Sequence, residues 1–519
     1  MLRWIRLATV ENSSPRLSPR RRGLLIFAIM GASIIQFLDA TIANVAIPHM
    51  QTSLSATRDS VTWVLTSFII AGVVAIPITG WLADKIGARR LFLFAVSGFI
   101  LASMLCGAST NLTEMVIFRI FQGIFAAFIS PLSQTVLLDI STPEEQPRVM
   151  TYWSVGIMIA PILGPTIGGW LTESYNWRWV FYINLPVGLP ALAVMWWLLP
   201  ERPPRPRKLD MFGYCMFAFA LAALQLMLDR GQQKDWLDSW EIIILMMLAV
   251  AGFWIFLVHM VTTKNPLFDL TMFRNRNFAT VMSFMIIMGM VMVAIAALLP
   301  PMLQNLYGYS AMDTGLLLAP RGLGTLIVMA LIPQFMKVFD SRWLLSFGFA
   351  LVTFSLYQMT GWTLEMGPTP ILVSGFIQGI GMGFLFMPLN LMAFATLPPH
   401  LRTDGSSLLT LLRNLGASIG ISLITTMLSR NIQISHSDIS ANVTSFSLPG
   451  VDPASADRLG TYGQTALQLL DLEMNRQAAM IAYLNDFKMM AFMVALAIPL
   501  ALLLKSTKQN SAEKRTMSE

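Results

Sequence analysis

The sequence GIMIAPILGPTIGGW, residues 156–170, decides the fold of this chain. Its two prolines and four glycines stand in an apolar segment that carries no charge from Tyr152 to Thr172. Such a composition would destabilise a helix in water. In a membrane, neighbouring helices can satisfy the backbone groups that proline frees, and glycines let a second helix approach closely. The stretch therefore predicts a close-packed, bent transmembrane helix, which is either a hinge or a kink that only packs well.

The composition of the whole chain is that of an integral membrane protein. The 519 residues are 55% hydrophobic and 12% charged, whereas an ordinary soluble chain is roughly 25% charged. Cys106 and Cys215 both lie in apolar runs, so neither a disulfide framework nor a CxxC metal or redox motif is expected. None of the four histidines lies mid-span, and no nucleophile, acid and base recur at usable spacing. We therefore expect no catalytic residues, no metal, no cofactor and no enzymatic activity.

Runs of about 20 apolar residues predict fourteen transmembrane helices. The first apolar run is too long for the apolar core of a signal peptide, so a cleaved leader is not expected. The predicted limits are 23–47, 61–82, 90–108, 113–138, 150–171, 179–199, 211–229, 240–261, 278–302, 314–337, 343–363, 370–396, 405–429 and 485–505.

The basic residues sort to one side of these spans. Of 35 lysines and arginines, 24 lie in segments on the side of the N-terminal tail, eight lie in the opposite segments, and three lie within spans. The positive-inside rule then places both termini in the cytoplasm. It also accounts for the net charge of +7 without a nucleic-acid partner.

An internal repeat divides the chain into halves. Asp84 precedes the Gln-Gly-Ile step at 122–124 as Asp340 precedes the same step at 378–380, and the offset of 256 also relates Gly164 to Gly420. Spans 1 to 6 therefore map on spans 9 to 14, an arrangement typical of transporters. The expected domains are a basic tail at 1–22, a six-helix bundle at 23–200, two inserted helices at 201–265, a second bundle at 266–505 with an outer loop at 430–484, and a tail at 506–519.

Asp39 and Arg119 are the candidate proton-coupling residues, because ionisable groups inside a span are costly and often functional. Their positions in spans 1 and 4 put them roughly 12 and 9 Å below the outer surface, so the two side chains can meet. We hypothesise that Asp39 takes up a proton from outside when it is desolvated and gives it up when it pairs with Arg119. The alternative is a permanent ion pair that only locks the two spans together. Because the second half has Ile295 and Gly375 at these positions, we expect coupling in the first half.

The inner connection at 80–91 is the candidate gating element. It combines glycines at 80 and 87 with Asp84 and the paired Arg89 and Arg90. A tight turn and an acid beside a helix N-terminus would form a latch on the inner side. Charge that sets topology explains Arg89 and Arg90 equally well, but it does not explain Asp84.

For three further features, the sequence allows two alternative roles each. Arg321 and Arg413 have no obvious acid opposite them, and each either lines an aqueous path or reaches the interface or a backbone carbonyl. Span 9 is rich in methionine, including Met285, which suits promiscuous apolar ligands but is also common as core or lipid-facing filler. The outer loop contains an amphipathic helix that either lies on the protein or docks an external partner; its apolar positions are Leu467, Leu470, Met474, Ala478 and Ile481.

These motifs resemble the major facilitator superfamily in its fourteen-span drug:proton antiporter branch (DHA2), across nearly the whole chain. The segment 80–91 is similar to the family signature between spans 2 and 3, and Arg119 with the following Gln-Gly is similar to the span 4 motif. Residues 38–48 and 176–186 resemble motifs of the fourteen-span branch, although Ala43 stands where the family usually has valine. The antiporter motif of span 5 is matched by Pro161, Gly164, Pro165, Gly168 and Gly169.

The resemblance extends to the EmrB-like multidrug efflux permeases of that branch. It implies proton-coupled export of a small lipophilic compound from the bacterial inner membrane, together with a periplasmic adaptor protein and an outer-membrane channel. Because no second intramembrane carboxylate matches those used for cationic drugs, neutral, lipophilic or anionic substrates are favoured. Export of a lipid, fatty acid or metabolite, or a membrane scaffold or sensor that has lost transport, remain alternatives. The expected substrate cavity is lined by Gln36, Gln122, Met285, Gln378 and Asn390.

Overall fold

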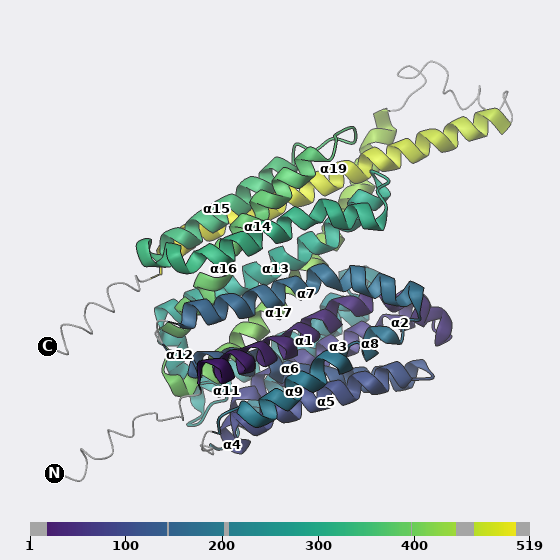
Figure 1. Ribbon diagram of the computed structural model, residues 1–519. Helices are drawn as coiled ribbons and strands as arrows, with labels where there is room; N and C mark the ends of the chain where they lie inside the picture. The colour runs from purple at the N-terminus through teal and green to yellow at the C-terminus, as the bar shows by residue number, and fades with distance from the viewer. Residues whose placement is uncertain (1–17, 143–144, 202–206, 396, 443–460, 505–519) are drawn as a thin grey trace, which may run out of the picture. The chain divides into compact units, whose positions relative to one another are not determined.

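Helices make up the fold of this chain, as a computed structural model shows (Figure 1). The structure describes residues 18–142, 145–201, 207–395, 397–442 and 461–504, and these contain no β-strand. Twelve of the helices in this part are long and apolar enough to span a membrane. The expected class of an all-α membrane protein is confirmed. The count of fourteen spans stays a prediction, because the helices for the expected spans 150–171 and 343–363 are not among the twelve.

The chain forms two units, which are described separately here. Unit 1 comprises Met1–Ala222, Gly252–Asp269 and Pro398–Thr410. Unit 2 comprises Ala223–Ala251, Leu270–Leu397 and Leu411–Glu519. The domain limits expected from the sequence stay predictions.

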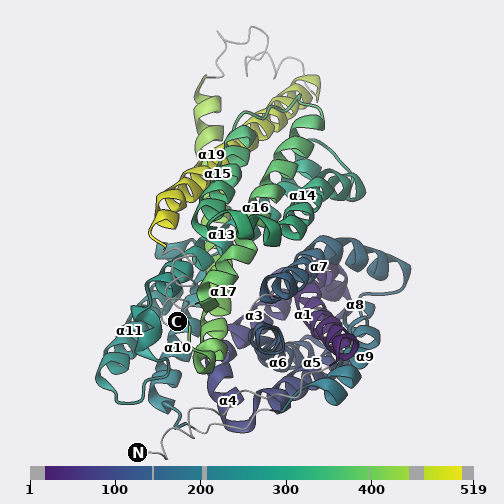
Figure 2. The same ribbon diagram turned by 60° about the vertical axis from the view of Figure 1, so that its left-hand side comes forward.

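Unit 1 contains the helices of the first six expected spans. In Figures 1 and 2, α6 lies beside α3 and α5, and α1 lies beside α7 and α9. Short helices connect them at both ends of the unit. The elements are α1 (Pro19–Ser53), α2 (Arg58–Val61), α3 (Trp63–Ala75), the 3₁₀ helix η2 (Ile76–Ile78), α4 (Thr79–Ile86), α5 (Ala88–Ala108), α6 (Leu112–Asp139), α7 (Gln146–Ser174), α8 (Trp179–Tyr182) and α9 (Asn184–Leu198).

Small residues bring the helices of unit 1 close together. Gly123 of α6 lies against the backbone carbonyl of Phe68 in α3, where a Cβ atom would collide with the oxygen. Between α1 and α7, the buried indole of Trp153 donates a hydrogen bond to the hydroxyl of Ser33 at 3.0 Å. Packing of this kind holds helices together in a membrane, because an apolar side chain gains little free energy when it moves from lipid to a contact with another helix.

The helical hairpin expected as an insertion is formed by α10 (Met211–Arg230) and α11 (Trp240–Thr262), joined by the 3₁₀ helices η3 (Gln232–Lys234) and η4 (Trp236–Asp238). Close to the open end of the hairpin, Phe217 stacks on Phe256 with ring centroids 4.4 Å apart. At its turn, Arg230 pairs with Glu241.

Unit 2 contains the helices of the last six expected spans. Here α16 lies between α14 and α15, and α15 also packs along α19. The elements are α12 (Leu270–Arg274), α13 (Arg276–Asn305), α14 (Ala311–Val338), α15 (Ser341–Met359), α16 (Thr369–Ala395), the 3₁₀ helix η5 (Pro399–Leu401), α17 (Arg402–Asn442) and α19 (Thr461–Leu502); η5 and the start of α17 belong to unit 1.

The last two helices extend beyond their expected spans, because much of the expected outer loop is helical. With 42 residues, α19 is about 63 Å long, roughly twice the hydrocarbon thickness of a bilayer. Figure 1 shows its first turns projecting past the rest of unit 2. The amphipathic segment expected in the loop is therefore the first part of α19, and His436 of α17 contacts Asp471 of α19 at 3.3 Å.

The apolar residues of that segment differ in how far they are buried. Leu467, Leu470 and Met474 are half-buried and Ala478 is buried, whereas Ile481 is exposed. Residues 443–460, which also belong to the expected outer loop, lie outside the described part of the chain.

Candidate functional site

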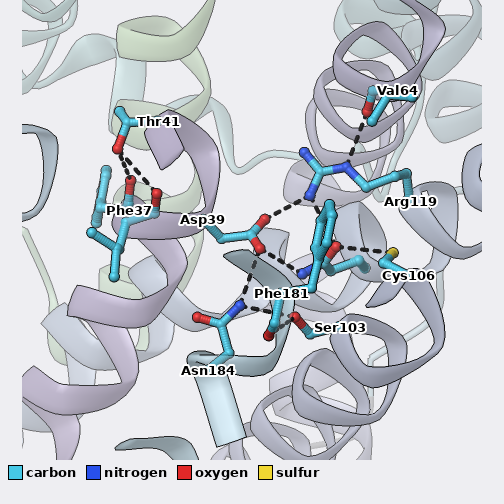
Figure 3. A network of polar contacts seen from close by, with 11 residues as sticks. Phe37, Asp39, Thr41, Val64, Ser103, Cys106, Arg119, Phe181 and Asn184 are labelled. Atoms are coloured by element: carbon cyan, nitrogen blue, oxygen red, sulfur yellow. Dashed lines mark hydrogen bonds and ion pairs between the residues drawn. The ribbon is translucent and has the colours of Figure 1, made fainter. Parts of the chain in front are cut away.

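Asp39 and Arg119 form a buried ion pair in unit 1. Arg119 Nη1 on α6 donates to Asp39 Oδ2 on α1 at 2.6 Å (Figure 3). Both residues have a relative exposure of 0%. The contact that the sequence suggested between spans 1 and 4 is thus present, in a setting without solvent.

The second oxygen of Asp39 is held by two amides. Gln122 Nε2, one turn after Arg119 on α6, donates to Asp39 Oδ1 at 2.9 Å, and Asn184 Nδ2 at the start of α9 donates to it at 3.1 Å. Asn184 Nδ2 also contacts Ser103 Oγ on α5 at 2.8 Å, and this hydroxyl donates to the carbonyl of Phe181 at 2.9 Å. The carboxylate is thereby tied to α5, α6 and α9.

The guanidinium of Arg119 is satisfied by other groups as well. Its Nε donates to the carbonyl of Val64 at 3.0 Å, and its Nη1 also contacts Gln122 Oε1 at 2.9 Å. The ring of Phe68 lies 4.1 Å from the guanidinium carbon, a distance at which an aromatic face stabilises a cation. The ion pair is therefore enclosed by backbone, amide and aromatic groups.

This arrangement makes the proton and the helix packing interdependent. Removing one partner of a desolvated ion pair leaves a buried charge without compensation, which is strongly unfavourable. Protonation of Asp39 would do the same to Arg119, unless the helices move so that Arg119 finds water or another partner. A proton on Asp39 would therefore favour a different arrangement of α1, α5, α6 and α9.

Three residues of this network were not predicted in that role. Gln122 was expected in the substrate cavity, and its position three residues after Arg119 places it on the same helix face. Ser103 gave no distinguishing signal, because single hydroxyls are tolerated in membrane helices. Asn184 lies in the segment 176–186 that resembles a motif of the fourteen-span branch, and this was the indication available for it.

The inner connection forms a second charged cluster, within unit 1. Gly87 ends α4 with φ of 92°, a conformation that favours glycine. Arg207, which precedes α10, pairs with Asp84 at 3.2 Å and with Asp404 in the first turn of α17 at 2.7 Å. Gly80 lies directly against the Asp404 carboxylate, so that a Cβ atom there would collide with it.

The two arginines of the same connection differ in their surroundings. Arg89 donates to the carbonyl of Trp196 in α9 at 2.7 Å and pairs with Glu201 at 3.3 Å. Arg90 is exposed. The sequence did not single out Arg207 or Asp404, because each stands among other charges near a span end.

The glycine-rich stretch of span 5 is part of α7, which runs unbroken from Gln146 to Ser174. Gly164 lies against the Thr41 hydroxyl of α1, and a Cβ on Gly168 would come within 2.7 Å of the Ile42 side chain. Gly169 has nothing within 4 Å of its Cβ position. Close packing is therefore concentrated at two of the glycines; the side chains of Pro161 and Pro165 lie outside the described part.

The residues expected to line the substrate cavity are distributed over both units. Gln36 belongs to unit 1 with Gln122, and its buried Oε1 has no partner among the described residues. In unit 2, Met285 is buried, Asn390 Nδ2 donates to the carbonyl of Phe386 at 2.8 Å, and the fully buried Gln378 has no described partner for either amide atom.

The two lone arginines of the sequence both belong to unit 2. Arg413 on α17 is buried and Arg321 on α14 is half-buried. The backbone carbonyls of both arginines lie where another helix has a glycine, Gly379 against Arg321 and Gly289 against Arg413. Their positions therefore also serve close helix packing.

Comparison with known proteins identifies the family of this chain. The Major Facilitator Superfamily profile matches residues 29–421. The chain is 35% identical over 483 residues to "Multidrug export protein EmrB" of Escherichia coli (strain K12), covering 92% of this chain and 94% of that protein. It is also 35% identical over 423 residues to "Fatty acid resistance protein FarB" of Neisseria gonorrhoeae, covering 80% and 82%.

A solved structure shows the same fold. The human organic anion transporter MFSD10 (TETRAN) aligns with a TM-score of 0.56 at 14% identity, over 92% of this chain and 100% of that one. The family profile and the relatives define a multi-pass membrane transporter rather than an enzyme. The chain belongs to the major facilitator superfamily, among its EmrB-like members, and the resemblance drawn from its motifs is confirmed.

Proposed function

We propose that this protein exports lipophilic compounds from the cell in exchange for protons. The observation that carries the proposal is the fully buried Asp39–Arg119 pair, whose carboxylate is held by groups from two other helices, α6 and α9. Among the relatives, two of the most similar are named for multidrug export, which supports a drug or another toxic compound as cargo.

Asp39 is the residue that binds the transported proton. When Asp39 is charged it pairs with Arg119 and holds α1 against α6; when it is protonated the pair loses its Coulomb attraction and the packing changes. The alternative of a permanent structural pair keeps Asp39 charged throughout. Exchange of protons between the two sides of the membrane requires that Asp39 be reached from each side in turn.

The gating motif and the antiporter motif serve the same cycle. The gating motif holds the inner side closed through the contacts of Arg207; its residues are Gly80, Asp84, Gly87, Arg89 and Arg90. When this cluster opens, cargo can bind from that side. In the antiporter motif, Gly164 and Gly168 provide the surface of α7 against which α1 moves. Pro161, Pro165 and Gly169 complete the motif.

Neutral, lipophilic or anionic compounds are the substrates we expect. Gln36, Gln122, Met285, Gln378 and Asn390 are the proposed cavity residues, and the free amide atoms of Gln36 and Gln378 support hydrogen bonding to a cargo molecule. The relative named for fatty acid resistance supports the second candidate, export of a physiological lipid or fatty acid by the same machinery.

The proposed setting is the bacterial inner membrane, with both termini in the cytoplasm and a periplasmic adaptor and outer-membrane channel as partners. The positive-inside distribution supports this orientation. The outer extension of α17 and α19 supports an adaptor contact, because Leu469 and Leu472 are exposed there at 62% and 66%.

Inverted membrane vesicles test the proposal. A fluorescent lipophilic dye should be transported into the vesicles when the vesicle interior is acid. This transport should stop after a protonophore collapses the proton gradient. Asp39→Asn vesicles should show no gradient-driven movement, and Glu365→Gln, which changes an exposed acid between α15 and α16, should behave as wild type. Absence of gradient-driven movement for every compound in a chemically varied panel would instead indicate a scaffold or sensor.

A further inference from the structure

Unit 2 contains a second buried carboxyl, Asp486 on α19. Its side chain has a relative exposure of 0%, and it belongs to the segment Leu467–Leu502, which is long and apolar enough to span a membrane. Asp486 stands sixteen residues before Leu502 at the inner end of the helix, a rise of about 24 Å. Because the hydrocarbon layer is about 30 Å thick, this depth falls within the outer half of the membrane.

Asp486 differs from Asp39 in having no partner. Neither of its oxygens has a hydrogen-bond partner among the described residues. The polar groups turned toward it are the Asn431 side chain on α17, which does not reach hydrogen-bond geometry, and Tyr483 one turn earlier on α19. The packed helices α13 and α15 bring no basic side chain within ion-pair distance in the described part of the chain.

The internal repeat explains why this carboxyl is unpaired. In unit 1 the sixth helix, α9, carries Asn184 fourteen residues before its end, and in unit 2 the sixth helix, α19, carries Asp486 at a similar distance. The fourth helix keeps its glutamine, Gln378, but Gly375 replaces the arginine that would neutralise an acid. Unit 2 thus has an acid in its sixth helix, where unit 1 has an amide, and it lacks the cation that accompanies Asp39.

Burial without a counter-charge favours the neutral acid over the carboxylate. A proton is the ligand that fits, since the side chain has no exposed surface for an organic cation. In the described residues, no group of three or more histidine, cysteine, aspartate or glutamate side chains could hold a metal ion.

We propose that Asp486 is a proton-binding site of unit 2, separate from Asp39, which holds its proton at neutral pH and releases it when a conformational change brings water to the carboxyl group. The O–H bond of the acid then breaks, the proton passes to water, and the carboxylate is solvated. This inference deepens the proposed exchange mechanism and rests on it for its effect on transport, whereas proton binding can be measured without transport.

Infrared difference spectroscopy on the full-length protein in lipid nanodiscs, without cargo, tests the site directly. A protonated carboxyl gives a C=O stretching band that shifts on deuteration. Wild type should show this band at pH 7, and Asp486→Asn should lack it. Asp39→Asn and Glu473→Gln should retain it, because Asp39 is paired and Glu473 is exposed.

Each outcome decides the proposal. Absence of the band in wild type at pH 7, or a band unchanged by Asp486→Asn, would overturn it. If Asp486→Asn does not give monodisperse protein, Asp486→Glu replaces it: a band at a shifted frequency supports the site, and an unshifted band refutes it.

Transport separates this inference from the proposed function. In inverted vesicles, Asp486→Asn should keep some gradient-driven dye movement but alter its pH dependence, whereas Asp39→Asn should abolish it. If dye movement by the wild type does not depend on the proton gradient but the infrared band is present, the proposed function is refuted and the proton site at Asp486 is still supported.

Discussion

Asp39 is the residue at which charge and packing meet. Its two oxygens bind Arg119, Gln122 and Asn184, so the state of one carboxyl group affects the contacts of α1, α6 and α9. Such a group is costly to keep in a membrane unless its charge is compensated or its proton is retained. The ion pair compensates the charge, and the proposed proton exchange requires that the carboxyl group also bind a proton.

Substitution of either partner should destabilise the protein. Asp39→Asn leaves Arg119 buried without a counter-charge, and Arg119→Gln does the same to Asp39; each should cost about 3–5 kcal/mol. The double variant leaves no unpaired charge, so its stability should recover toward wild type while export stays abolished. Thermal unfolding of purified protein, followed by intrinsic fluorescence, measures the first effect and vesicle transport the second.

The double variant also distinguishes the two roles considered for this pair. Full gradient-driven export by the double variant would mean that the pair only locks α1 to α6. Single variants as stable as wild type would show that the charges are not desolvated.

The sequence identified the charged pair because an aspartate and an arginine stand out within apolar spans. It did not identify Asn184 and Ser103, since neutral polar groups are common in membrane helices. Asp486 was also missed as a buried acid, because span 14 was expected to begin at residue 485 whereas α19 begins at Thr461. When a helix continues past the hydrocarbon, hydropathy does not mark the point where burial begins.

At the scale of elements, contact between α1 and α7 depends on the missing side chain of Gly164. A methyl group there would collide with the Thr41 hydroxyl, so Gly164→Ala should force the helices apart and cost about 1–3 kcal/mol. Gly169→Ala is the matched control, because its Cβ position has no neighbour within 4 Å. Thermal stability and dye export should both fall for the first variant and stay near wild type for the second.

Equal behaviour of the two glycine variants would contradict this account of α7. It would mean that the antiporter motif acts through backbone flexibility shared by its glycines rather than through close packing with α1.

The N-terminal ends of the same two helices are joined by a pH-sensitive ion pair. Arg22 at the start of α1 donates to Glu145, which precedes α7, at 2.7 and 2.6 Å. The hydrogen bond from Arg22 is the main cause that lowers the pKa of Glu145 below its ordinary value of 4.5. A carboxyl whose pKa is lower in the folded state contributes stability above its unfolded pKa and loses that contribution as the pH falls through the folded pKa.

Glu145→Gln should therefore be less stable than wild type at pH 7, and the difference should disappear as the pH falls below 4.5. Melting temperatures of both proteins across this range measure it. A difference that persists unchanged in acid would assign the effect of the substitution to packing rather than to charge.

At the scale of the whole molecule, topology is the property that most needs an independent test. Seven expected spans separate Glu201 from Ala441, so these exposed positions should face opposite sides of the membrane. In a protein without its native cysteines, a membrane-impermeant maleimide should label Ala441→Cys in intact cells. It should label Glu201→Cys only after permeabilisation.

Labelling of both positions under the same condition would show an even number of crossings between them. The orientation drawn from the basic residues would then fail, together with the assignment of the α17 and α19 extension to the outer side.

Much of the architecture was predictable from the chain because bulk properties determine it. Composition, the basic-residue asymmetry and the 256-residue repeat indicated an all-helical transporter of two related halves, and the family assignment agrees. Helix ends were less predictable. The expected loop 430–484 contains helical extensions of α17 and α19, since outside the bilayer capping and helix pairing, rather than hydropathy, determine where a helix stops.

The projecting part of α17 and α19 offers a way to watch this protein at work. Ile434, Leu469 and Leu472 present an exposed apolar face on two helices that touch through His436 and Asp471. An antibody fragment raised against that face would bind unit 2 through its helices rather than through a loop. Carrying one fluorophore of a donor–acceptor pair, with the other attached to an exposed residue of unit 1, it would report the motion of unit 2 during turnover by single-molecule energy transfer, without any label inside the bilayer.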